Sequence, residues 1–314
     1  MLKLFDILNK YWESNKKKKT DSNKRSTFDN EKQKVKLNLS NAVDKKLGKI
    51  DDFDSIAFYN ELVDKVKRIY NGKIEEISYS QINEIVERLI DVLFLENFTD
   101  LLNICISDYH SKQDYLYAHI TNVFIMVQKI GVSLNYERSN LKELAMATFL
   151  HDIGIMSYLD IINKNRKLTP DEYKRVKEHP TVGSALLKKV SDGFNRSIVE
   201  TVEQEHERFD GSGYPQGLKG DSISEYARII GLVDVYEAML HWRPYRERYS
   251  PLETIQTILK NKESFDHRVI KALIKTIGIF PIGVMVRLSN KEIGVVIEEN
   301  PQFPLRPVID VLWD

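Results

Sequence analysis

Apolar residues recur three and four positions apart along most of the chain between residues 53 and 275. This spacing predicts amphipathic helices. Two such patterns, separated by Asn71-Gly72, predict a small helical region up to residue 105. The helix expected over Ile120–Ile130 is apolar on most faces, which is typical of a helix at the centre of a bundle. We therefore predict an all-α fold for the greater part of the chain.

The pattern changes after Pro281. Val284–Leu288 and Ile293–Ile297 are short apolar runs separated by a polar turn, and Val308–Leu312 is a third run. Runs of this length and spacing predict strands rather than helices. We expect a small structural β extension over residues 281–314, following a helical N-terminal region over 41–105 and a central helical domain over 106–280.

Composition narrows the functional classes. The chain has 314 residues, with 46 Lys and Arg against 46 Asp and Glu, so no overall field attracts nucleic acid and no nucleic-acid partner is expected. The single cysteine, Cys105, lies in an apolar stretch and cannot form an intrachain disulfide, which fits a reducing cytoplasm. No apolar run approaches the roughly 18 residues of a membrane span, and the N-terminus does not resemble a signal peptide.

The first 40 residues differ in composition from the rest of the chain. Apolar residues at helical spacing over residues 1–12 precede Lys16–Lys19 and a charged, Ser- and Asn-rich stretch that cannot build a core. Two interpretations stay open. Residues 1–19 form an interfacial helix with a polybasic segment that contacts anionic lipid, or a short helix docks on a partner protein or on its own domain ahead of a solvated linker. The helical region up to residue 105 has no visible chemistry and suits packing, homodimerisation or sensing.

The candidate chemistry centres on His151-Asp152, which closes the apolar run Leu144–Leu150. A carboxylate can bridge two cations, and a neutral imidazole suits Fe, Mn or Zn. A lone His-Asp pair is more often an ordinary cap, but Asp234 also lies within an apolar helix, Ile229–Ala238, where an unpaired carboxylate is costly to bury. Carboxylates and histidines on separate helices favour a metal site in a bundle core. The candidate ligands are His119, His151, Asp152, His179, His206 and Asp234.

Six ordered motifs give a more specific resemblance. They are Asp114–His119, Leu150–Gly154, Glu178–Pro180, His206–Pro215, Asp234–Met239 and Arg243–Arg246. Over roughly residues 105–275 they resemble the HD-GYP domain, an all-helical branch of the HD metal-dependent phosphohydrolases. The resemblance implies an HD-type helical bundle, a catalytic domain over 106–280, and hydrolysis of the bacterial second messenger cyclic di-GMP to linear pGpG, GMP or both.

The resemblance also implies roles for single residues. It implies two divalent ions, iron or manganese, because Tyr115 stands where relatives with a third ion have a glutamate. The catalytic pair is His151 and Asp152, and a metal-bound hydroxide is the nucleophile. Asp152 bridges two ions, the first held with His119, His151 and Asp234 and the second with His179 and His206. The implied substrate contacts are Tyr214, Arg243 and Arg246.

Two departures from the family pattern leave the function open. Ile155 replaces a lysine thought to contact the scissile phosphate, and Glu205 replaces the first of two histidines. A carboxylate can still ligate iron, manganese or zinc, so Glu205 stays a candidate ligand. The chain is then either a working cyclic di-GMP phosphodiesterase, or an impaired domain that binds cyclic di-GMP or metal and signals through protein contacts. A different cyclic dinucleotide or nucleotide phosphoester as substrate is a third alternative.

Overall fold

The computed structural model describes residues 53–72, 77–94, 98–106, 115–164, 166–190, 193–242, 247–298, 300, 303 and 306–313. These residues fall in the compact unit Asp54–Asp314, apart from Phe53. The longer helices of this unit, with their bounds, are α3 (Ser55–Asn71), α4 (Tyr79–Val92), α5 (Phe98–Ile106), α6 (Tyr115–Ser133), α7 (Arg138–Leu150), α10 (His179–Leu187), α11 (Arg196–Gln204), α12 (Glu225–Leu240), α13 (Pro251–Lys260) and α14 (His267–Ile277). The shorter ones are α8 (Leu159–Ile162), α9 (Pro170–Val176) and the 3-10 turns η2 (Ile153–Tyr158), η3 (Gly220–Ser222) and η4 (Lys262–Ser264).

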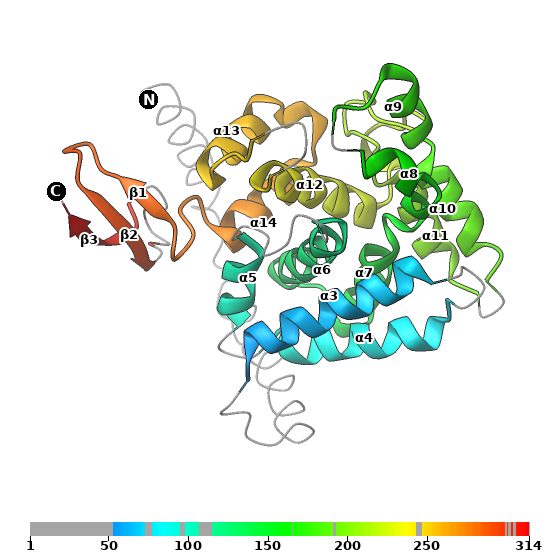
Figure 1. Ribbon diagram of the computed structural model, residues 1–314, viewed down its shortest axis with the longest axis horizontal. Helices are drawn as coiled ribbons and strands as arrows, with labels where there is room; N and C mark the ends of the chain where they lie inside the picture. The colour runs from blue at the N-terminus through cyan, green and yellow to red at the C-terminus, as the bar shows by residue number, and fades with distance from the viewer. Residues whose placement is uncertain are drawn as a thin grey trace, which may run out of the picture. The chain divides into compact units, whose positions relative to one another are not determined.

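Helix α6 lies at the centre of the bundle (Figure 1). It contacts α3, α5, α7, α12 and α14. Its residues from Ala118 to Gln128 are all buried, and this run includes the polar side chains His119, Thr121 and Asn122. A helix that is apolar on most faces can only be stable when neighbours cover it on every side. The central position predicted for Ile120–Ile130 is confirmed.

Helix starts follow the capping residues in the sequence. Thr169 accepts a hydrogen bond from the Glu172 backbone N–H, and the Glu172 carboxylate accepts one from the Thr169 N–H. This reciprocal arrangement satisfies two donors that the first turn of α9 leaves unpaired, with Pro170 at the first helical position. Asp54 caps α3 in a simpler way, accepting from two backbone N–H groups.

The three predicted strands form an antiparallel sheet in the order β1-β2-β3. Their bounds are β1 (Met285–Arg287), β2 (Ile293–Glu298) and β3 (Val308–Trp313). In the first pair Val286 lies opposite Gly294, and in the second Val295 lies opposite Asp310. The predicted fold class, a helical bundle with a helical N-terminal region and a small C-terminal β extension, is therefore confirmed. The tail and short helix expected over residues 1–40, with the lipid contact proposed for 1–19, lie outside the described residues.

One stretch, Arg138–Ile162, meets the length and composition of a membrane span. About 72% of its most apolar window is buried inside the protein. It holds α7, η2 and α8, and the core helices of soluble proteins pass the same test, so it is weak evidence for a membrane span. Its burial has a different consequence, because it fixes the residues that follow α7 at the centre of the molecule.

Candidate metal centre

The end of α7 delivers His151 and Asp152 to the interior. The Nδ1–H of His151 donates to the carbonyl of Thr148 at 2.7 Å, which places the lone pair of the ring on Nε2. This Nε2 atom is buried and has no hydrogen-bond partner among the described residues. A buried imidazole nitrogen in this state is suited to bind a cation.

His119 and Asp234 reach the same point from helices α6 and α12. The Nε2 atom of His119 lies 3.1 Å from Oδ1 of Asp234, and its Nδ1 atom is hydrogen-bonded to Glu237. Here too a hydrogen bond at Nδ1 directs Nε2 into the site. His119, His151 and Asp234 each offer one ligand atom, and these three atoms lie within 4.8 Å of one another.

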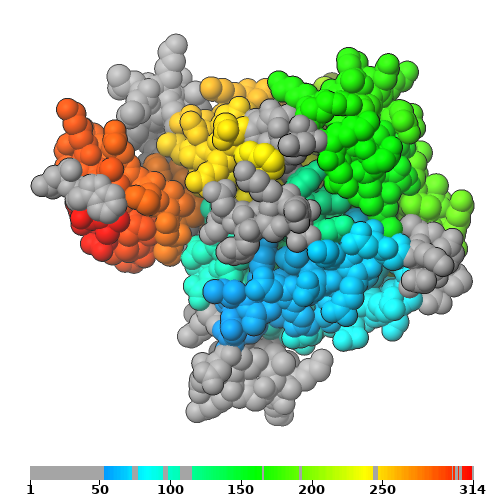
Figure 2. Space-filling model, viewed as in Figure 1, coloured from blue at the N-terminus to red at the C-terminus, as the bar shows by residue number. Residues whose placement is uncertain are grey.

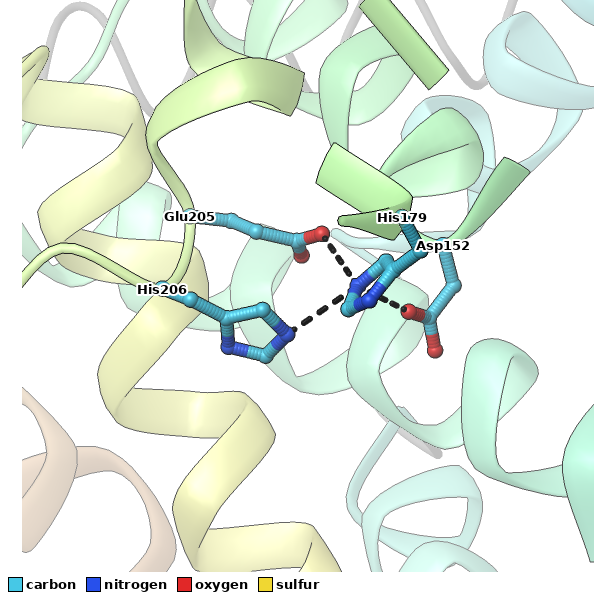
Figure 3. Close-up of side chains that lie close together, drawn as sticks. All are labelled: Asp152, His179, Glu205 and His206. Atoms are coloured by element: carbon cyan, nitrogen blue, oxygen red, sulfur yellow. Dashed lines mark hydrogen bonds and ion pairs between the residues drawn. The ribbon is translucent and has the colours of Figure 1, made fainter. Parts of the chain in front are cut away.

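A second cluster lies beside the first. Asp152, His179, Glu205 and His206 also offer one ligand atom each within 4.8 Å. Figure 3 shows Asp152, Glu205 and His206 pointing toward the ring of His179. The Nδ1–H of His179 donates to the carbonyl of Val176 at 2.7 Å, so its Nε2 faces the other three.

His179 is the first residue of α10. Pro180 lies in the first turn of α10, where a backbone N–H has no partner within the helix, so proline costs no hydrogen bond there. Helix α9 already ends at Val176. The proline therefore marks the start of the helix that presents His179.

Asp152 stands between the two clusters. Its Oδ2 atom lies 3.9 Å from Nε2 of His119 and 3.7 Å from Nε2 of His151. Its Oδ1 atom lies 3.2 Å from Nε2 of His179. One carboxylate oxygen thus faces each cluster, which is the arrangement that a bridging carboxylate requires.

Three buried carboxylates give the site its charge. Burial opposes ionisation of Asp152, but the nearby His151, His179 and His119 outweigh it and hold its pKa below the ordinary value. Burial likewise opposes ionisation of Asp234, yet His119 and His206 lower its pKa to about 2. For Glu205 burial dominates and raises the pKa to about 7. These three carboxylates therefore favour a cation at the centre of the site.

The two histidines of the second cluster differ in protonation. Burial disfavours the charged form of His179, but the carboxylates of Asp152, 3.2 Å away, and Glu205, 3.4 Å away, raise its pKa to about 10. His206 lies half-buried beside this positive charge, and loss of solvation together with His179 lowers its pKa to about 3. Their Nε2 atoms are 3.1 Å apart, so only one of them carries the proton of the shared hydrogen bond. A divalent cation would replace that proton between the same carboxylates.

Two glycines allow the ligand-bearing segments to approach one another. A Cβ atom on Gly154 would lie 2.0 Å from the carbonyl oxygen of His179, and one on Gly231 would lie 2.2 Å from that of Glu205. Both neighbours are backbone atoms that cannot move aside alone. Glycine at these positions therefore lets the turn after Asp152 pack on α10, and lets α12 pack on the residue that follows α11.

The donor set fits divalent cations. Besides Nε2 of His151, both carboxylate oxygens of Glu205 are buried without a hydrogen-bond partner among the described residues, and the nearest ion-pair contact is 3.4 Å, from Nε2 of His179 to Oε1. Buried polar atoms are almost always satisfied, and an unpaired buried carboxylate is costly. Each cluster thus holds buried ligand atoms that a bound cation would satisfy, and nitrogen with carboxylate oxygen suits Fe, Mn and Zn.

Two family models match this chain. The model described as "HD domain" matches residues 105–269, and the model described as "KOW domain associated with HD domain" matches residues 285–314. The chain belongs to the HD domain family. The HD-GYP resemblance carried by the sequence motifs is confirmed by relatives with known names.

One relative is the cyclic di-GMP phosphodiesterase PA4108 of Pseudomonas aeruginosa, which is 34% identical over 65% of this chain and 49% of its own length. Another is the 3'3'-cGAMP-specific phosphodiesterase 1 of Vibrio cholerae, 32% identical over 52% of this chain and 38% of its own length. The chain thus spans half or less of the length of these relatives. A solved structure, Bd1817, an HDG"Y"P protein from Bdellovibrio bacteriovorus, matches 79% of both chains with a TM-score of 0.58 and 14% identity, and supports the fold alone.

A cleft of about 360 Å³ opens onto the candidate metal ligands of this HD domain. Its lining includes Asp152, His179, Tyr214 and Ile155. Ile155 is only 6% exposed, so an apolar side chain stands beside the bridging carboxylate. Of the implied substrate contacts, Tyr214 lies at this cleft, whereas Arg243 and Arg246 lie outside the described residues.

The ring of Tyr214 is held by two neighbours. It lies 4.8 Å from the ring of His206, and Nζ of Lys177 lies 4.4 Å from its centre. The loop that carries it is fixed by Glu207, whose two oxygens accept hydrogen bonds from the backbone N–H groups of Gln216 and Leu218. Tyr214 is therefore positioned by the loop before any ligand arrives.

Two functional residues were missed by the sequence analysis. Glu207 and Glu237 each lie within one of the ordered motifs, but the sequence alone assigned neither of them a role. Glu237 is fully buried and bonds to His119, to Asn122 at 2.8 Å and to His241 at 2.9 Å. The signal was present, because Glu237 lies in the same apolar helix as Asp234 and the argument about buried carboxylates applies to both.

Glu237→Gln is expected to weaken metal binding by about 10- to 100-fold, the range typical of residues that orient a metal ligand. Glutamate accepts from three donors, whereas glutamine turns an N–H₂ group toward at least one of them and loosens His119. Titration of metal-free protein with Mn²⁺ measures the change. The matched control is Glu143→Gln, since Glu143 accepts from Asn195 at 2.5 Å on the surface of α7 and should leave the affinity unchanged. Equal affinity in Glu237→Gln and the wild type would contradict the assigned role.

Proposed function

We propose that this protein is a metal-dependent phosphodiesterase that hydrolyses cyclic di-GMP to linear pGpG, GMP or both. The observation that carries the proposal is the position of Asp152, with one oxygen toward each of two histidine-containing clusters. Membership of the HD domain family and the names of the relatives support the same activity. The open cleft beside Asp152 gives a phosphodiester access to this point.

The proposed cofactors are two divalent ions, iron or manganese. Bound there, they would supply charge neutralisation at the phosphate and lower the pKa of a bound water. His119, His151 and Asp234 would hold one ion, His179, Glu205 and His206 the other, and Asp152 would touch both. We propose His151 and Asp152 as the catalytic pair; Nε2 of His151 is buried without a hydrogen-bond partner among the described residues, so it is available to a cation.

The chain's own residues would place the substrate. Tyr214, fixed against His206 and Lys177, would meet a base or phosphate at the mouth of the cleft. Arg243 and Arg246 are proposed to clamp phosphate oxygens, for which the planar guanidinium is suited. Ile155, which is only 6% exposed, would give the cleft an apolar lining on its side.

A second candidate function rests on two specific residues. Ile155 supplies no charge at the cleft, and Glu205 adds a third carboxylate to Asp152 and Asp234. Both changes reduce electrostatic stabilisation of a dianionic transition state. The alternative is therefore an impaired domain that binds metal or cyclic di-GMP and acts through protein contacts. The cGAMP-specific relative makes a different cyclic dinucleotide a third candidate.

Other proposals concern the setting of the activity. We propose a division into a charged segment over 1–40, a helical region over 41–105, the catalytic domain over 106–280 and the β extension over 281–314. A cytoplasmic location follows from a cyclic dinucleotide substrate and the single buried Cys105. The helical region before residue 105 is the proposed contact for a second copy or a protein partner.

The deciding experiment combines metal analysis and turnover on one anaerobic preparation reconstituted with iron or manganese. Two metals per chain and repeated turnover of cyclic di-GMP would support the phosphodiesterase. Tight binding of cyclic di-GMP without product would support the impaired domain instead. Faster turnover of 3'3'-cGAMP than of cyclic di-GMP would change the substrate but not the reaction.

Glu205→Gln separates a ligand from a structural carboxylate. If Glu205 binds metal, the variant should lose about tenfold or more in affinity at the second cluster, since one charged ligand is replaced by an amide. The metal-free variant should also unfold at a higher temperature than the wild type, because glutamine removes a buried ionisable group whose oxygens have no hydrogen bond among the described residues. Metal titration and thermal unfolding measure the two effects. Unchanged metal affinity would assign Glu205 a structural role.

A further inference from the structure

A continuous line of buried polar groups joins helix α3 to the first cluster. The Tyr59 hydroxyl donates to Oδ1 of Asn122 at 2.9 Å, and Nδ2 of Asn122 donates to Oε1 of Glu237 at 2.8 Å. The other oxygen of Glu237 is bonded to Nδ1 of His119, whose Nε2 faces Asp234 at 3.1 Å. Four side chains on three helices thus share one hydrogen-bonded line.

All four side chains lie in the interior. Tyr59 is 6% exposed, His119 4%, Asn122 1% and Glu237 0%. Buried polar networks of this kind are effective only when every member is satisfied, and they then hold a single arrangement. Each donor in this line meets an acceptor, so the orientation of the Asn122 amide is determined at both ends.

The line starts outside the segment that matches the HD domain. The match begins at residue 105, whereas Tyr59 belongs to α3, Ser55–Asn71. Figure 2 shows that α3, in blue, runs along the surface of the molecule. A second tyrosine of α3 reaches inward as well, since the Tyr70 hydroxyl donates at 2.8 Å to the carbonyl of Phe149, two residues before His151. One surface helix therefore bonds to Asn122, which supports Glu237, and to the last turn of α7, which leads into His151.

We propose that Tyr59 is a positioning residue for the metal centre, acting through Asn122 and Glu237 on His119, so that α3 adjusts the affinity of the first cluster for its cation. This inference rests on the proposed metal site. It gives the helical N-terminal region a physical route to that site. A displacement of α3 that breaks the Tyr59–Asn122 bond frees the amide that supports Glu237.

The direction of the effect follows from hydrogen-bond chemistry. Without the Tyr59 hydroxyl, Oδ1 of Asn122 is left as a buried acceptor that lacks the bond it has now, which favours other positions of the amide. Any rotation that turns Oδ1 toward Glu237 sets oxygen against oxygen. Glu237 then holds Nδ1 of His119 less firmly, and Nε2 is less well directed at the cation.

Tyr59→Phe tests the proposal because it removes one hydroxyl and keeps the ring. We expect about three- to tenfold weaker Mn²⁺ binding to metal-free protein, less than for a residue bonded directly to a ligand. The matched control is Tyr236→Phe, because Tyr236 is fully buried and its hydroxyl has no hydrogen-bond partner among the described residues. Its affinity should equal that of the wild type. A loss in the control as large as in Tyr59→Phe overturns the proposal.

A double variant separates this route from a general loss of stability. If Tyr59 acts through Glu237, adding Tyr59→Phe to Glu237→Gln weakens Mn²⁺ binding no further. If the two effects multiply, Tyr59 acts in another way and the proposed route is wrong.

A measurement without metal keeps the inference distinct from the proposed function. In metal-free protein, the nitrogen resonances of the His119 ring should shift in Tyr59→Phe. Those of His151, which is bonded to the carbonyl of Thr148, should not. If the wild-type protein binds no metal, the proposed metal site is refuted. If the His119 resonances still shift in Tyr59→Phe, the line from Tyr59 to His119 is supported. Unchanged His119 resonances overturn the inference whatever the metal content.

Discussion

Asp152→Ala is expected to remove bound metal from both clusters and to reduce turnover of cyclic di-GMP by about 10³-fold or more, the scale on which lost transition-state charge stabilisation acts. The reason is the position of its two oxygens. Oδ2 faces His119 and His151, and Oδ1 faces His179. Alanine removes a side chain that contributes an oxygen atom to each side.

Metal analysis of the reconstituted variant measures the effect, together with turnover on the same sample. Asp160→Ala is the matched control, because Asp160 is an exposed carboxylate on the neighbouring helix α8. It should keep the full metal content. Retention of two metals in Asp152→Ala would exclude a bridging role, and retention of one would show that the clusters fill independently.

Asp152→Asn refines the same test. The amide keeps the size of the carboxylate but turns one N–H₂ group toward a histidine nitrogen that should bind metal. We expect one cluster to lose its cation more than the other, since the asparagine oxygen can face only one side. A loss confined to one cluster would reveal which side of Asp152 binds more tightly.

The candidate metal ligands could be picked out from the sequence because each stands in an unusual context or in one of the ordered motifs. Asp234 lies in an apolar helix, His151 and Asp152 end a buried one, and the ordered motifs identified the remaining ligands. Helical periodicity likewise located α6 at the centre, since only a covered helix is apolar on most faces. These are local properties, and a single sequence displays them directly.

What the sequence could not show depends on contacts between distant segments. Tyr59 and Asn122 are 63 positions apart, and His119 and Glu237 are 118 apart. From the sequence, a tyrosine in an amphipathic helix is expected only to pack in the core. The hydrogen bond of its hydroxyl is known only from the structure. The need for glycine at positions 154 and 231 could not be predicted either, because only the packed structure shows the backbone atoms that a Cβ would meet.

The position of Ile155 connects the family pattern with the chemistry of the cleft. The sequence identified the missing lysine, and the structure places the isoleucine in the lining of the cleft together with Asp152 and His179. Besides histidines, two cations in the described part of the chain line this cleft: Lys167, which is exposed in the segment before α9, and Arg166, which is held by Glu172 at 2.7 Å and 2.9 Å. Among the described residues, the cleft therefore has positive charge from these two side chains and from His179, but none at position 155.

Ile155→Lys is therefore expected to raise turnover of cyclic di-GMP on the order of 10²-fold, by analogy with restoring one donor to a transition state. The gain should appear in kcat more than in KM, because the ammonium group acts on charge that develops during the reaction. Steady-state kinetics on protein fully loaded with metal measures it. Ile155→Met is the control, since it changes shape without adding charge and should leave kcat near the wild-type value.

The outcome of Ile155→Lys also decides between the two functional classes. The side chain is 6% exposed, so the new ammonium must reach the cleft or lose stability by burial. In metal-free protein it would pair with Asp152 or Glu205 and compete with the cation, so metal content has to be measured beside kcat. A fully metal-loaded variant with unchanged kcat would mean that the missing lysine does not limit catalysis. The added carboxylate of Glu205 would then be the remaining reason for slow turnover, and the impaired, ligand-binding class would gain the stronger support.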